Sequence, residues 1–159
     1  MGTKGEQYAK QFEAKADGAT ALLEKLTDAD WKKTTSAEKW TVAATAHHVA
    51  GSYEPITHII ETIAAGQPLP HFTPQMLDER NAQHARDFAN CARAETIALF
   101  KKGTTAAVTL LRGLSDAELS KSGTVFAGLP AMTAEEMVKR ALLDHLDEHF
   151  GSIRATIGR

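Results

Sequence analysis

The sequence is poor in the residues that mark several protein classes. It contains a single cysteine, Cys91, so no disulfide can form within the chain and a disulfide-stabilised scaffold is excluded. Aromatic residues make up only 6% of the 159 residues. Aliphatic side chains and alanine must therefore fill the core, and long sheets are disfavoured. No apolar run approaches the roughly 20 residues that a membrane-spanning helix requires, so we expect no membrane segment.

The chain also has little net charge. Its 18 Lys and Arg residues are mixed with 20 Asp and Glu residues, and the net charge is −2 with histidines neutral. Binding to a phosphate backbone needs clustered cations, so a nucleic acid is not an expected partner. Residues 1–15 are charged and lack the apolar core of a signal peptide, which makes a cytoplasmic location the expectation.

Amphipathic segments with helical periodicity account for most of the chain. We expect helices over approximately 7–26, 40–66, 74–113 and 133–157. Pro74 suits the first turn of the third and longest helix, in which Gly103 is a weak point. Thr133-Ala-Glu-Glu136 matches a capping box at the start of the fourth helix.

These segments predict the fold class. Four amphipathic helices without a strand pattern can bury their apolar faces only against one another. We therefore predict an all-α four-helix bundle with a long third helix and a linker, residues 115–132, before the fourth. The length fits a single domain over residues 1–159.

Two histidines lie on the apolar face of the fourth predicted helix. His145 and His149 are four residues apart, so at about 100° per residue their side chains point the same way, one turn apart. This HxxxH spacing lets two ring nitrogens converge on one metal ion. A buried imidazole needs partners for both ring nitrogens, and a metal would satisfy one nitrogen of each ring.

A third inward histidine is expected on the second helix. His48 lies at the edge of its apolar face, whereas the neighbouring His47 points about 100° away and is expected to face solvent. Metal ligands in bundles come from facing helices, which favours a site made by His48, His145 and His149. The alternative is a buried polar cluster without metal. His58, His71 and His84 are interpreted as surface or loop residues.

Together these motifs resemble the DinB/YfiT-like superfamily of metal-binding four-helix proteins. In that family a Trp opens the second helix and the first ligand follows eight residues later, as Trp40 and His48 do here. The family's last helix carries an HxxxH pair, here His145 and His149. The resemblance implies a divalent metal, zinc or nickel, held by three histidines with its other positions open to water.

The resemblance leaves the activity open. Some relatives are S-transferases that activate a low-molecular-weight thiol, some are thiol-dependent isomerases, and some are described as hydrolases. It implies a small-molecule substrate, with a thiol as the cosubstrate, and homodimers are common among such proteins. A non-enzymatic metal-stabilised binding or stress-response module is the alternative.

The remaining candidates are weaker. No carboxylate falls clearly on the histidine faces, because Asp144 and Glu148 diverge from their neighbours around the helix, so the general base is unknown. Cys91 is expected to be a buried, unreactive side chain. Asn81 could line a pocket and Ser52 could support His48, although ordinary packing or surface roles explain both residues better.

Overall fold

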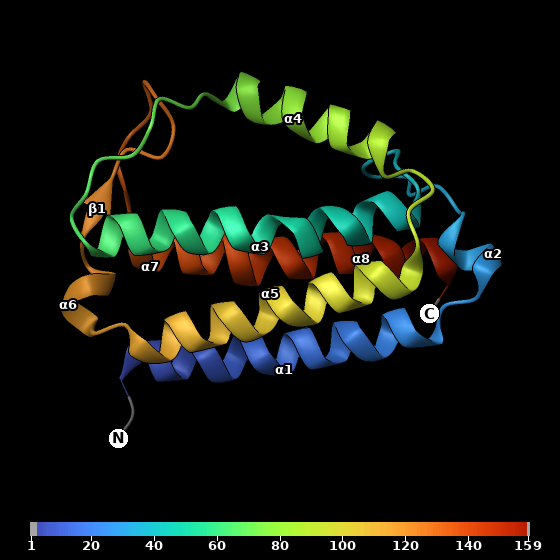
Figure 1. Cartoon of the computed structure of the whole chain (residues 1–159), viewed down its shortest axis with the longest axis horizontal. Helices are drawn as coiled ribbons and strands as arrows, with labels where there is room; N and C mark the ends of the chain where they lie inside the picture. The colour runs from blue at the N-terminus through green and yellow to red at the C-terminus, as the bar shows by residue number, and fades with distance from the viewer. Residues whose placement is uncertain (1–2, 159) are drawn as a thin grey trace.

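A computed structural model describes residues 3–158 of the chain (Figure 1). Long helices form its body: α1 (Lys4–Lys25), α3 (Val42–Ala64), α5 (Arg93–Gly113) and a last helix made of α7 (Ala134–Met137), η1 (Val138–Asp144) and α8 (His145–Ile157). The other elements are α2 (Asp28–Trp31), α4 (Pro74–Asp87), α6 (Asp116–Leu119), β1 (Ser122–Gly123) and β2 (Met132–Thr133).

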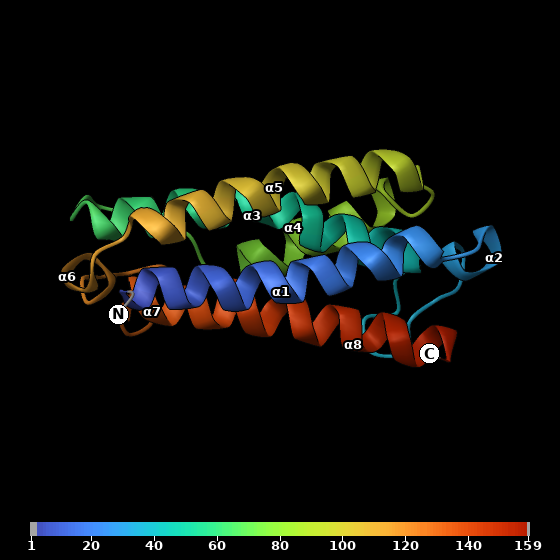
Figure 2. The ribbon, with the colours of Figure 1, turned by 90° about the horizontal axis from the view of Figure 1, so that it is seen from below.

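The four long helices pack as a bundle, which confirms the predicted fold class. Helix α5 lies against both α1 and α3, and α3 lies beside α8 (Figures 1 and 2). One continuous apolar core fills the space between them. Its largest fully buried side chains include Phe12, Tyr53, Phe100 and Phe150. In the described part of the chain no helix is long and apolar enough to cross a membrane.

Threonine side chains fix the starts of the long helices. Thr41 accepts a hydrogen bond from the backbone N–H of Ala44 at the start of α3, and Thr133 accepts one from Glu136 at the start of α7. An oxygen at this position satisfies a backbone donor that the first helical turn leaves free. The predicted start at Thr133 is therefore confirmed, and threonine caps fix where both histidine-bearing helices begin.

The prediction of one long third helix is wrong. The segment is broken between α4 and α5 by a turn over residues 88–92. Two side chains from elsewhere hold this turn: the indole N–H of Trp31 donates to the Cys91 carbonyl, and the Thr41 hydroxyl donates to the Ala89 carbonyl, both at 2.8 Å. Helix α5 enters the bundle, whereas α4 lies outside against α3 and has no buried residue.

The predicted linker before the last helix is confirmed, with some local structure. It holds the short helix α6 and a two-residue antiparallel pairing in which Ser122 lies opposite Thr133 and Gly123 opposite Met132. Phe72, which precedes α4, stacks on Phe126 of this linker with ring centroids 6.0 Å apart. The linker therefore supports the start of the outer helix.

Gly103 marks the closest approach of α5 to α3. A Cβ atom at this position would lie 2.8 Å from Cδ2 and 2.9 Å from Cβ of Tyr53. Tyr53 is fully buried and in ring contact with Phe12 and Phe100, so it has no room to move. The glycine is thus required by helix packing, and α5 continues through it.

Gly103→Ala is therefore expected to be less stable than Gly18→Ala by about 1–3 kcal/mol, the usual cost of overpacking a core. Gly18 also lies inside a helix, but a Cβ there would meet nothing within 4 Å. Both substitutions gain the same helix propensity, about 1 kcal/mol, so the difference isolates the packing cost. Urea denaturation of the two variants in EDTA measures it, and equal stabilities would contradict the close approach.

Candidate metal centre

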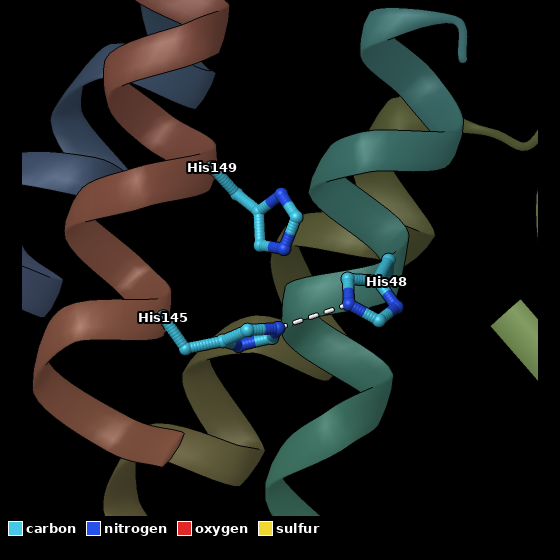
Figure 3. Close-up of side chains that lie close together, drawn as sticks. All are labelled: His48, His145 and His149. Carbon is cyan, nitrogen blue, oxygen red and sulfur yellow. Dashed lines mark hydrogen bonds between the residues drawn. The ribbon is translucent and has the colours of Figure 1, made fainter. Parts of the chain in front are cut away.

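The structure brings the three predicted histidines together. His48 comes from the second turn of α3, and His145 and His149 come from successive turns of α8 facing it (Figure 3). The Nε2 atoms of His48 and His145 are 3.0 Å apart. One ring nitrogen from each of the three residues lies within 4.8 Å of the others. The rings thus converge from two helices on one small volume.

A π-helical segment immediately precedes the two histidines of α8. Residues Val138–Asp144 form η1, in which each turn contains more residues than an α-helical turn, and regular α-helix resumes at His145. Such segments are frequent beside functional sites because they change the direction of the side chains that follow. The prediction assumed 100° per residue throughout. It succeeded because both histidines lie in the same α-helical segment.

Burial keeps two of the rings uncharged at neutral pH. Desolvation, with a smaller contribution from the neighbouring His145 and His149, lowers the pKa of His48 to about 3. Desolvation lowers the pKa of His145 to about 4, and His149 adds to this effect. Neutral imidazoles retain a free lone pair, which is the form that binds a metal ion.

Glu38 holds the third ring. Its Oε2 atom lies 2.7 Å from Nδ1 of His149, and its Oε1 atom accepts a hydrogen bond from the hydroxyl of Ser152, one turn later on α8. Burial raises the pKa of Glu38, but the hydrogen bonds from Ser152 and His149 outweigh it, so the pKa is lowered overall. An ionised carboxylate only accepts hydrogen bonds. Nδ1 of His149 therefore carries a proton, so that in the neutral ring the lone pair lies on Nε2.

This carboxylate was missed by sequence analysis. Glu38 lies in the loop between α2 and α3, where no periodicity indicates which way a side chain points. The loop is ordered by its own backbone: Thr35 N–H donates to the Trp40 carbonyl at 2.8 Å, and Lys39 has a positive φ of 63°. The position of Glu38 two residues before Trp40 is the one local sign of its role.

Trp40 covers the cluster from the same loop. Its ring lies edge-on to His48, with centroids 5.2 Å apart, and stacked over His149, with centroids 6.1 Å apart. His149 is left with only 9% of its surface exposed. A large apolar ring against two imidazoles restricts their rotation and excludes water from that side.

The arrangement fits a divalent metal ion better than it fits packing alone. Nδ1 of His145 is buried without a hydrogen-bond partner, and its Nε2 faces the Nε2 of His48. Without a cation one Nε2 must donate a proton to the other, whereas a cation between the rings would bind the lone pairs of both. Among residues 3–158, no fourth His, Cys, Asp or Glu joins the cluster, so further coordination positions are not filled by such a side chain.

Two expectations about the other histidines are wrong. His47 and His84 were expected on the surface, but both are partly buried, and Nδ1 of His47 lies 2.8 Å from Nε2 of His84. The break before α5 explains this contact, because it lets α4 fold back along α3. His58 and His71 are exposed, as expected.

The weaker candidates take no part in the cluster. Cys91 is partly buried; desolvation raises its pKa, and its Sγ lies 3.5 Å from both the Ala43 carbonyl and the Thr96 hydroxyl, so it is not an activated thiol. The Ser52 hydroxyl donates to the Val49 carbonyl of its own helix. Asn81 is half-buried on the outer helix α4.

The metal-free protein is expected to lose stability as the pH falls from about 6.5 towards 4. Unfolded histidines take up protons near 6.5, whereas the folded pKa values of His48 and His145 are about 3 and about 4. The unfolded state therefore binds more protons in this window, which favours unfolding. Urea denaturation in EDTA at several pH values measures the free energy of unfolding, which should fall less steeply with decreasing pH in His145→Gln than in wild type. The exposed His58→Gln is the control, and identical slopes for all proteins would contradict the assignment.

Several solved structures have a similar fold, among them the following two. A mycothiol-dependent maleylpyruvate isomerase matches with a TM-score of 0.73 and 15% identity over 96% of this chain, which spans 63% of that enzyme's length. YfiT from Bacillus subtilis, described as a probable metal-dependent hydrolase with an unusual four-helix bundle topology, matches with a TM-score of 0.70 and 21% identity, covering 98% of this chain and 86% of its own. At these identities the likeness establishes the fold.

The sequence matches none of the functionally curated proteins with which it was compared. Residues 11–153 match the sequence profile of the DinB superfamily. This match covers the Trp40 loop and all three histidines of the cluster, and it agrees with the bundle and with the resemblance drawn from the motifs. The chain therefore belongs to the DinB superfamily.

Proposed function

We propose that His48, His145 and His149 bind one divalent metal ion, zinc or nickel, and that the protein is a metal-dependent enzyme acting on a small molecule with a thiol cosubstrate. The observation that carries the proposal is the convergence of three ring nitrogens within 4.8 Å, with His149 held by the Glu38 carboxylate. Imidazole is a common ligand of both metals.

The residues around the cluster hold the three histidines in orientations and protonation states that suit metal binding. Glu38 fixes the tautomer and the ring orientation of His149, as carboxylates do behind metal-bound histidines. Trp40 restricts two of the rings, and burial keeps His48 and His145 neutral. A metal held by three neutral ligands retains its positive charge, and when bound it would polarise a substrate oxygen or acidify a water or thiol in an open position.

A thiol-dependent reaction, S-transfer or isomerisation, is the activity we favour. Free thiols have a pKa of about 8.5, so a thiol needs activation to react as a thiolate at neutral pH. The protein's own thiol is unsuited, because Cys91 is partly buried and its pKa is raised. The similar fold of a mycothiol-dependent isomerase supports a small external thiol as the cosubstrate.

Two other functions remain candidates. Metal-dependent hydrolysis is favoured by the similarity to YfiT, and it would need the same open position for water. A non-enzymatic metal-stabilised binding module would need the same three histidines but no accessible position. If the protein is such a module, neither thiols nor other small ligands should change the absorption spectrum of protein in which Co²⁺ replaces the native metal.

Protein purified without a histidine tag is expected to contain close to one zinc or nickel ion per chain, measured by elemental mass spectrometry. His145→Ala removes one of the three nitrogens and should lower the bound metal at least tenfold at the same free metal concentration. His58→Ala, which removes an exposed histidine from α3, should retain the wild-type content. Absence of metal in wild-type protein dialysed against zinc and nickel would refute the proposed site.

Glu38→Gln is expected to weaken metal binding by about 10–100-fold, the usual effect of losing a carboxylate behind a histidine ligand. The amide keeps the shape but not the charge that fixes the His149 tautomer. Ser152→Ala, which removes only the second hydrogen bond to Glu38, should have a smaller effect. Competition with a chelator measures both affinities. An unchanged affinity in Glu38→Gln would show that Glu38 supports folding rather than the metal.

A further inference from the structure

A second pair of histidines faces each other beside the proposed centre. His47 precedes His48 on α3, and His84 belongs to the outer helix α4. Nδ1 of His47 and Nε2 of His84 are 2.8 Å apart, and the two rings are tilted by 31°. Phe88 stacks on both rings, with centroids 3.9 Å from His47 and 4.5 Å from His84. The Phe88 ring thus packs against both imidazoles, and the two facing nitrogens lie close together.

The nitrogen separation matches that of two neighbouring ligands on a metal ion. With metal–nitrogen bonds of about 2.0–2.1 Å, nitrogens at a right angle on one ion are about 2.9 Å apart, and tetrahedral ligands are about 3.3 Å apart. The pair at 2.8 Å therefore suits the right-angled positions that nickel and copper prefer. The His48–His145 pair of the first site has nearly the same separation, 3.0 Å.

Two carboxylates lie within electrostatic reach of the pair. Glu95 acts on His47, and Asp87 acts on His84. Both side chains belong to exposed residues at the ends of α4 and α5, so they can move towards a cation. Without a cation, one of the two facing nitrogens must donate a proton to the other, whereas a cation would bind the lone pairs of both.

We propose that His47 and His84 form a second, weaker site for a divalent transition-metal ion, which ties α4 to α3. The two imidazoles supply the permanent ligands, and water or the neighbouring carboxylates fill the other positions. Because the ring centroids of His84 and His48 are 5.9 Å apart, an ion in the first site repels an ion in the second. Since the first site offers three imidazoles and the second only two, the second site fills after the first and against this repulsion.

The ion would act on a helix that lies outside the bundle. Helix α4 has no buried residue, and its described ring contacts with α3 are those of His84 with His47 and His48. Binding across the pair would hold the end of α4 beside the first site. The inference does not depend on catalysis by that site.

The test is equilibrium dialysis of the metal-free, tag-free full chain against increasing concentrations of Ni²⁺, with bound nickel counted by elemental mass spectrometry. Wild type is expected to bind two ions per chain in two steps. His84→Gln should weaken the second step at least tenfold and leave the first within about twofold. His145→Ala should weaken the first step and retain an ion at the second. Binding of one ion at all concentrations would show a hydrogen-bonded pair and overturn the proposal.

Two controls separate this site from adventitious binding and from loss of structure. His58→Gln and His71→Gln each remove an exposed histidine and should keep both steps. Loss of the second step in either would overturn the proposal. Hydrogen exchange of residues 74–87 gives an independent measurement: the second Ni²⁺ should slow exchange at least fivefold in wild type and not in His84→Gln. Equal slowing in both proteins would also overturn it.

Discussion

The imidazoles of His48, His145 and His149 can lie buried together only if neighbouring rings are not protonated at the same time. Two protonated rings at the 3.0 Å separation of His48 and His145 would repel each other in surroundings that solvate neither. The structure meets this constraint in two ways. Burial keeps His48 and His145 neutral, and His149 has an ionised carboxylate, Glu38, on its Nδ1 atom. The remaining lone pairs face a common centre that suits a cation.

Helices supply the candidate ligands of this centre, and a loop supplies their support. His48 comes from α3, which begins at the Thr41 cap, and the HxxxH pair comes from α8, which continues the helix that begins at the Thr133 cap of α7. The loop before α3 adds Glu38 and Trp40. Sites built on helices keep their geometry more precisely than sites built on loops. This division explains how the same bundle can carry different reactions when loops and outer elements change.

The outer layer is the part of this chain that differs most from a simple bundle. The break at residues 88–92 releases α4 from the core and sends it back along α3. This return places His84 against His47 and beside His48. Imidazole neighbours therefore lie beside the three-histidine cluster, in addition to the Glu38 carboxylate.

The sequence by itself determined the helical class, the start of the last helix at Thr133 and the shared inward face of His145 and His149. Each of these depends on local rules: helical periodicity, capping, and the four-residue spacing that places two side chains on one face. The profile match to the DinB superfamily agrees with the same motifs.

Tertiary structure alone decided the break in the predicted third helix, the role of Glu38 and the pairing of His47 with His84. The helix breaks where Trp31 and Thr41 bind backbone carbonyls at residues 91 and 89, and helical periodicity does not reveal these contacts. Glu38 reaches His149 across 111 positions of sequence from an irregular loop. Periodicity describes which residues share a face. It does not describe which distant segment comes to lie against that face.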